Sequence, residues 1–218
     1  MRVAEIWQYP VKSMVGTPVP AADLAPTGLV GDRTWAVRDQ VRGGIRGAKV
    51  LGGLMQLSAR YRAGDDATGG AVAIALPDLS AFPEVILEFE SPPGTYHDVH
   101  PLMIMTTSAL RSLEAALPGS NVDVRRFRPS LVVDTGDADG HPERDWIGRR
   151  VRIGDTVVAI EGGCPRCVMV TRRIDDAVPQ DRTILRHIVR DLGQDVGVYA
   201  TVVEPGRLAA GDDVELLA

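Results

Sequence analysis

The sequence predicts a mainly β protein, with β-barrel character and a smaller α+β component. Two observations support this fold class, and a third shows that the chain can bury a core. Short apolar runs separated by Gly, Pro and Asp fill the first half of the chain. Helical apolar periodicity is confined to two segments of the second half. The chain has 218 residues and is 44% hydrophobic, which is enough to bury a substantial core.

The first half consists of short expected strands. They cover residues 2–11, 34–37, 54–62, 71–76 and 85–89. Pro10 has no amide hydrogen to donate, so it restricts the first strand to a sheet edge or to ending there. After Ser91-Pro92-Pro93-Gly94 the pattern changes, and residue 92 is the expected boundary between two domains, 1–92 and 93–218.

The second half is expected to carry two short helices among further strands. Leu110, Leu113 and Leu117 share one face of a helix over residues 107–117, with Thr106 or Thr107 as its N-cap. A second helix over residues 182–192 should begin after the cap Asp181 and stop at Gly193. The remaining strands are expected at residues 131–133, 150–153, 156–160, 198–203 and 213–217.

Composition narrows the possible partners. The chain has 24 basic and 29 acidic residues, and its net charge of −5 argues against a nucleic-acid partner. No run approaches the ~18 apolar residues of a membrane helix, and Glu5 interrupts the start before a secretory signal develops. Two cysteines are too few for a disulfide framework. These features together favour a reducing, cytoplasmic setting with no membrane partner.

Cys164-Pro165-Arg166-Cys167 is the most informative short segment, and several interpretations fit its spacing. A zinc site needs four ligands, and the histidines lack the paired spacing to complete one. A thioredoxin-like dithiol should open a helix, but Val168 and Val170 make a poor helix start. A thiolate ligand for a soft metal, with Arg166 lowering the thiol pKa or binding an anion, also fits. Two buried structural cysteines are the fourth interpretation.

The segment from Gly162 to Arg172 resembles the cysteine segment of MOSC proteins, the family named after the C-terminal domain of molybdenum-cofactor sulfurases. Other blocks resemble the same family in the same order. They are Tyr9-Pro10-Val11-Lys12-Ser13, residues 28–35 (GLVGDRTW), Arg126-Phe127-Arg128-Pro129-Ser130, Trp146-Ile147-Gly148 and Gly197-Val198-Tyr199-Ala200. The resemblance covers nearly the whole chain. It implies an N-terminal β-barrel domain followed by a MOSC β-barrel, as in amidoxime-reducing components and bacterial reductases of N-hydroxylated compounds.

The resemblance also implies a molybdenum cofactor, a metal held by a pterin dithiolene with a phosphate tail. Cys167 matches the metal ligand of the family and Cys164 does not. The donor set that the resemblance implies for the cofactor comprises Lys12, Ser13, Arg33, Thr106, Thr107, Arg128 and Ser130; Arg166 joins it as the cation of the cysteine segment that could bind an anionic part of the cofactor. Arginine forks and hydroxyls suit phosphate and pterin oxygens. Relatives commonly have asparagine at the position of Ser130. The family is also associated with pyridoxal phosphate binding.

The function implied is reduction of an N-hydroxylated small molecule. Two cysteines cannot bind an all-cysteine iron–sulfur cluster, so electrons should come from a separate donor protein. A cofactor carrier, or a sulfur carrier with a persulfide on a cysteine, uses the same motifs and stays an alternative. The segment from Arg42 to Lys49, rich in glycine and basic residues, is expected to be either a loop over the site or a solvated hairpin turn.

Overall fold

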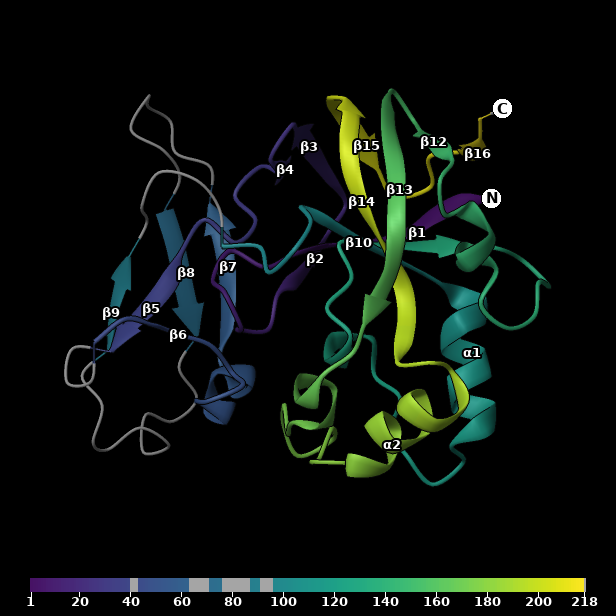
Figure 1. Ribbon diagram of the computed structural model, residues 1–218. Helices are drawn as coiled ribbons and strands as arrows, with labels where there is room; N and C mark the ends of the chain where they lie inside the picture. The colour runs from purple at the N-terminus through teal and green to yellow at the C-terminus, as the bar shows by residue number, and fades with distance from the viewer. Residues whose placement is uncertain (40–42, 63–70, 76–86, 91–95, 218) are drawn as a thin grey trace.

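The structure is a computed structural model, and it describes residues 1–39, 43–62, 71–75, 87–90 and 96–217. Its strands form two groups (Figure 1). One group, with β5 to β9, lies to the left in the figure. The other contains a large sheet together with the two α-helices.

The large sheet combines both ends of the chain. Its eight strands lie in the order β16 (Val214–Leu216), β12 (Arg150–Ile153), β13 (Thr156–Pro165), β14 (Asp195–Glu204), β10 (Leu102–Thr106), β11 (Leu131–Asp134), β1 (Arg2–Gln8) and β2 (Thr17–Val19). Only β10 and β11 pair in parallel among its strands. In β1, Ile6 lies opposite both Leu131 and Val19, so this strand is internal to the sheet.

The described residues also form three smaller sheets. A C-terminal strand again joins N-terminal ones, because β15 (Gly206–Ala209) pairs with β3 (Ala21–Ala25), which pairs with β4 (Gly28–Leu29). The other two sheets are β6–β5–β9 (Ile45–Arg46, Ala36–Asp39 and Leu87–Glu90) and β7–β8 (Ser58–Arg62 and Ala71–Ala75). The expected boundary at residue 92 lies outside the described residues.

The two α-helices begin at their expected caps. Helix α1 (Thr107–Ala116) starts after Thr106, whose side chain accepts a hydrogen bond from the Ala109 amide. Helix α2 (Arg182–Asp191) starts after Asp181, which accepts one from the Thr183 amide. Both caps satisfy amides that the first helical turn leaves unpaired. Short 3-10 helices lie at η1 (Gly52–Gln56), η3 (Val124–Arg126), η4 (Pro142–Trp146) and η5 (Val168–Thr171).

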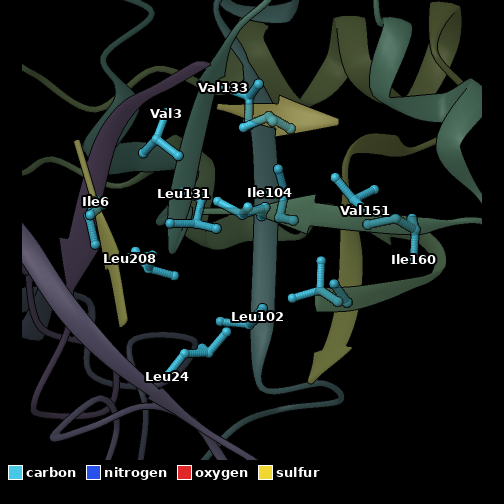
Figure 2. Close-up of a cluster of buried hydrophobic side chains, with 14 of the residues drawn as sticks. Val3, Ile6, Leu24, Leu102, Ile104, Leu131, Val133, Val151, Ile160 and Leu208 are labelled. Carbon is cyan, nitrogen blue, oxygen red and sulfur yellow. The ribbon is translucent and has the colours of Figure 1, made fainter. Parts of the chain in front are cut away.

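The main core is enclosed by the large sheet. Figure 2 shows side chains from β1, β10, β11, β12 and β13 pointing toward one another, with Ile104 among them. Leu24 and Leu208, from the small β3–β15 sheet, join this core. A second buried cluster lies under η1 and β7, and a third packs α1 and α2 against the sheet.

The predicted fold class is confirmed, since the chain is mainly β with two α-helices. Some element bounds differ from the expectation. Residues 54–57, expected at the start of a strand, lie mostly in η1, and the strand begins at Ser58. Strand β10 was not expected; all five of its residues are buried, so the sequence LMIMT has no polar alternation to mark it. Strand β13 runs five residues past its expected end and carries Cys164.

Candidate functional site

A cavity of about 120 Å³ lies where the N-terminal segment meets the cysteine segment. Its walls come from segments that are distant in sequence, from residue 12 to residue 199. The lining side chains that matter for its chemistry belong to Lys12, Ser13, Arg33, Tyr96, His97, Asp98, Arg126, Arg128, Cys164, Arg166, Cys167 and Tyr199. Six of the nine residues that the sequence analysis assigned to the site therefore share one cavity.

The end of β13 places the two cysteines in different environments. The β13–β14 register shifts between Ile160 and Gly162 and again between Gly163 and Pro165, and such bulges redirect a strand. At Gly163 a side chain would start 2.5 Å from a carboxylate oxygen of Asp195, so any larger residue would displace the Asp195 side chain. Cys164 is buried, whereas Cys167 is partly exposed at the start of η5, and both are free thiols.

Arg166 is a buried cation at the wall of the cavity. Its Nη1 donates to Cys164 Sγ at 3.1 Å and its Nη2 to the Phe127 carbonyl at 2.8 Å. Its guanidinium also lies 5.4 Å from the Phe127 ring centroid. Its Nε has no hydrogen-bond partner, although it is fully buried. An unpartnered buried donor is costly, and an anionic group in the cavity would satisfy it.

Cys164 is held from two sides. Besides accepting the bond from Arg166, Cys164 lies close enough to Tyr199 to affect the pKa of its hydroxyl. Burial, and then the neighbouring Cys164, raise the pKa of Tyr199 well above its usual value, so its hydroxyl stays protonated. Cys164 is therefore a buried acceptor that orients its neighbours, and Cys167 is the cysteine that faces open space.

Three lining residues have unusual backbone conformations. Among the described residues, four non-glycine residues have a positive φ, and three of them line the cavity: Ser13 (68°), Arg33 (50°) and Arg128 (57°). Non-glycine residues in this region are strained, and such strain concentrates at functional sites. The backbone is thus held in costly conformations where these side chains face the cavity.

The cavity wall is cationic. Arg33 pairs with the buried Asp32, while Lys12 pairs with Asp98 and donates to the Tyr96 carbonyl at 3.0 Å. Arg128 is buried and has no ion-pair partner among the residues that the structure describes; its Nη1 donates to the Met14 carbonyl. Burial and, after it, repulsion from Arg33 lower the pKa of Arg128 to about 10.

The remaining three predicted donors do not line the cavity. Thr106 is buried and caps α1, and it donates to Glu143 Oε2 at 2.6 Å. Thr107, the first residue of α1, donates a hydrogen bond from its hydroxyl to Asp134 Oδ1 at 3.3 Å. Ser130 is buried in the sheet, where its backbone amide donates to the Met103 carbonyl at 2.7 Å.

Several lining residues were not expected from the sequence. The segment Tyr96 to His100 forms one wall, and His97 has a pKa lowered to about 4, by burial and then by Arg33, so its ring is neutral at pH 7. The sequence does not mark these histidines, because their spacing is not that of paired metal ligands. Tyr199 alternates with buried residues in β14, so its burial pattern is that of an ordinary strand residue.

Arg126 was also unexpected and is 1% exposed. Its guanidinium donates to four main-chain carbonyls, at 2.9, 3.3, 3.0 and 2.6 Å, and those carbonyls belong to Asn121, Val170, Arg172 and Pro179. Val170 lies in η5 and Arg172 follows it directly. Arg126 therefore fixes the turn that follows Cys167.

The surroundings of the cysteine pair bear on the zinc-site and thioredoxin-like interpretations of its spacing. In the part of the chain described, no three His, Cys, Asp or Glu side chains converge as a metal site. The cysteine pair does not open an α-helix, and only the four-residue η5 follows it. In the glycine-rich segment, β6 pairs antiparallel with β5, and Gly43 and Gly44 have open space around them; Arg42 lies outside the described residues. Among the described helices, none is long and apolar enough to cross a membrane.

Known proteins are similar to this chain in sequence. Human mitochondrial amidoxime-reducing component 1 is 24% identical over 283 aligned positions, which cover 99% of this chain and 82% of the relative. Mitochondrial amidoxime reducing component 2 of Macaca fascicularis is 29% identical over 136 residues, or 55% of this chain and 38% of the relative.

Solved structures share the fold. The YuaD protein from Bacillus subtilis superposes with a TM-score of 0.59 at 13% identity, covering 99% of this chain and 94% of that one. The MOSC N-terminal beta barrel domain matches residues 1–92 and the MOSC domain matches residues 92–215. The chain therefore belongs to the MOSC domain family, with its N-terminal β-barrel domain in place.

Proposed function

We propose that this protein binds a molybdenum–pterin cofactor through Cys167 and uses it to reduce N-hydroxylated small molecules. Membership of the MOSC family supports a molybdenum-cofactor-related oxidoreductase. Two relatives are named for amidoxime reduction, and an amidoxime is an N-hydroxylated amidine.

One observation carries the proposal: the partly exposed Cys167 thiol opens on the same cavity as Lys12, Arg33, Arg128 and Arg166. A thiolate is a suitable ligand for a soft metal, and guanidinium groups suit a phosphate. The unpartnered Nε of Arg166 and the absence of an ion pair for Arg128 within the described residues leave positive charge to be neutralised. The residues present therefore fit the cofactor.

When bound, the cofactor would supply a metal that accepts an oxygen atom and changes its oxidation state. The chain itself holds the other groups in place. Arg126 fixes the turn after Cys167, and the Cys164–Arg166 bond aims the Arg166 guanidinium along the cavity wall. Tyr199 stays protonated beside them and can donate a hydrogen bond but cannot act as a base.

Electrons would come from a separate protein. The chain has two cysteines, too few for an all-cysteine iron–sulfur cluster of its own. A reducing compartment, such as the cytoplasm, would keep both thiols free. A donor would need to approach the cavity, because electron transfer requires proximity to the metal.

The test is metal and pterin content after expression in a host that makes the cofactor. The wild-type protein should contain molybdenum and pterin in about equal amounts and reduce benzamidoxime with a chemical electron donor. Cys167→Ser should lose both the metal and the activity, while the matched variant Cys164→Ser should keep the metal. A wild-type protein without molybdenum would refute the proposal.

The same experiment separates the carrier alternative. A protein that holds the cofactor but reduces no N-hydroxylated compound would be a carrier. A one-sulfur mass increase on Cys167 would identify a persulfide carrier.

A further inference from the structure

Tyr9 lies directly after β1 and is completely buried. Its backbone is tied to the segment that precedes Trp35. The Tyr9 amide donates to Asp32 Oδ1 at 2.5 Å, and its carbonyl accepts from the Arg33 amide at 2.7 Å. The ring is therefore fixed relative to the backbone of Arg33.

Two cations of the cavity wall lie over this ring. The guanidinium carbon of Arg128 is 4.3 Å from the ring centroid and that of Arg33 is 4.9 Å from it. Both distances are within the range of cation–π attraction. In addition, Arg33 Nη2 donates to the Arg128 carbonyl at 3.4 Å, so the two arginines are linked directly.

This arrangement needs an explanation, because two like charges repel and one of them is buried. Asp32 neutralises Arg33, but no carboxylate forms an ion pair with Arg128 within the described part of the chain. Burial and, after it, the repulsion from Arg33 lower the pKa of Arg128. The Tyr9 ring is the electron-rich group that both guanidinium groups contact.

We propose that Tyr9 is a positioning residue whose ring face holds Arg33 and Arg128 side by side at the cavity wall, so that both bind the same anion. The inference rests on the proposed function only in naming that anion as the phosphate tail of the cofactor. The ring contacts neither anion nor metal, since Tyr9 does not line the cavity.

The hydroxyl of Tyr9 separates this role from ordinary hydrogen bonding. It is buried and has no hydrogen-bond partner. Phenylalanine keeps the ring and removes only this unused hydroxyl, whereas leucine fills much of the space without a π face. The pair Tyr9→Phe and Tyr9→Leu therefore isolates the ring face.

The experiment measures the affinity of the full-length, cofactor-free protein for inorganic phosphate by isothermal titration calorimetry, and pterin content after expression in a cofactor-producing host. Tyr9→Leu should bind phosphate about tenfold more weakly, which corresponds to about 1.4 kcal/mol, and should retain less pterin. Tyr9→Phe should match the wild type in both. A Tyr9→Leu protein with wild-type phosphate affinity, or a Tyr9→Phe protein as weak as Tyr9→Leu, would overturn the inference.

A graded series guards against simple misfolding. Phenylalanine, 4-fluorophenylalanine and 3,4,5-trifluorophenylalanine at position 9 have nearly the same shape but a progressively weaker ring quadrupole. Phosphate affinity should fall stepwise along the series, and a flat series would contradict the inference.

Trp7→Leu is the matched control. Trp7 lies in β1, is buried and stacks at 6.3 Å from the Tyr9 ring, with no guanidinium over it among the described residues. The Trp7→Leu protein should lose stability but not phosphate affinity. An equal loss of phosphate affinity in Trp7→Leu and Tyr9→Leu would show that general packing, not the ring face, matters. The position-9 variants can show the expected dependence of phosphate affinity on the ring while the wild-type protein never contains pterin. In that case the proposed function fails and this inference stands.

Discussion

Replacing Arg126 by leucine removes one guanidinium that serves four carbonyls. A hydrogen bond to a charged group contributes about 1.5–3 kcal/mol net, and the contributions are not additive. Burial of the charge opposes them, and it lowers the pKa of Arg126. The expected loss of unfolding free energy is therefore about 4 kcal/mol, as for other buried polar networks that lose one member.

Thermal unfolding and urea titration, both followed by circular dichroism, measure this loss. In a chain of this size 1 kcal/mol shifts Tm by about 2–4 °C, so Tm should fall by about 8–16 °C. The matched control is Arg125→Leu. Arg125 pairs with Asp123 and Asp175 at 2.8 and 2.7 Å, but these groups are partly exposed, so the cost should be about 1 kcal/mol or less.

The difference in stability between Arg126→Leu and Arg125→Leu tests whether the buried carbonyls depend on Arg126. If Arg126→Leu is no less stable than Arg125→Leu, the four buried carbonyls do not depend on Arg126, and the argument that it fixes the turn after Cys167 is wrong. Alkylation of Cys167 by iodoacetamide gives a second measure, because a loosened η5 should change its rate.

Three further predictions follow from the site. Cys164→Ala should be about 1–3 kcal/mol less stable than Cys164→Ser in urea titration, because alanine leaves Nη1 of the buried Arg166 without its acceptor; equal stabilities would contradict this. Gly197→Ala should cost about 3 kcal/mol or more, since Gly197 has φ 75° and a Cβ there would lie 2.7 Å from the Ile104 carbonyl oxygen; unchanged thermal stability would show that the strand adjusts. His97 should titrate near pH 4 by NMR. Because its folded-state pKa is below the unfolded value of about 6.5, stability should fall as pH drops from 6.5 to 4, and His97→Gln should reduce this slope; a midpoint near 6.5 would refute the burial argument.

Features that depend on neighbours in sequence were predicted well. Thr106 and Asp181 cap their helices as expected, because a cap bonds to amides two or three residues away. Helix α2 ends before Gly193, which has φ 65°, as a C-terminal glycine should. The apolar β10 was missed, because burial on both faces removes the alternation that reveals a strand.

Long-range pairing was not predictable from local pattern. Nothing in residues 2–8 indicates that β1 lies between β2 and β11. Of these two neighbours, β11 is more than a hundred residues away in sequence. The same holds for β3, whose partner β15 is close to the end of the chain. Such pairings depend on which buried faces match in three dimensions.

For the site, the family resemblance named the lining residues Lys12, Ser13, Arg33, Arg128, Arg166 and Cys167. The positive φ of three of them carried no signal, because the sequence marks that conformation only when glycine is present. The role of Tyr9 was hidden for a related reason. A buried tyrosine at the end of a strand is ordinary, and its proposed role becomes visible only when two arginines that are distant in sequence are seen over its ring.

The placement of β1 between β11 and β2 bears on when the site can form during synthesis. Lys12 and Ser13 leave the ribosome early, but β11 follows more than a hundred residues later and Cys167 later still. The walls of the cavity can meet only after the cysteine segment has emerged, and β15 must then pair with β3. A ligand that requires both walls must therefore bind after Cys167 has been synthesised, and truncation shortly after Cys167 should abolish its capture even though every lining residue up to that cysteine is present.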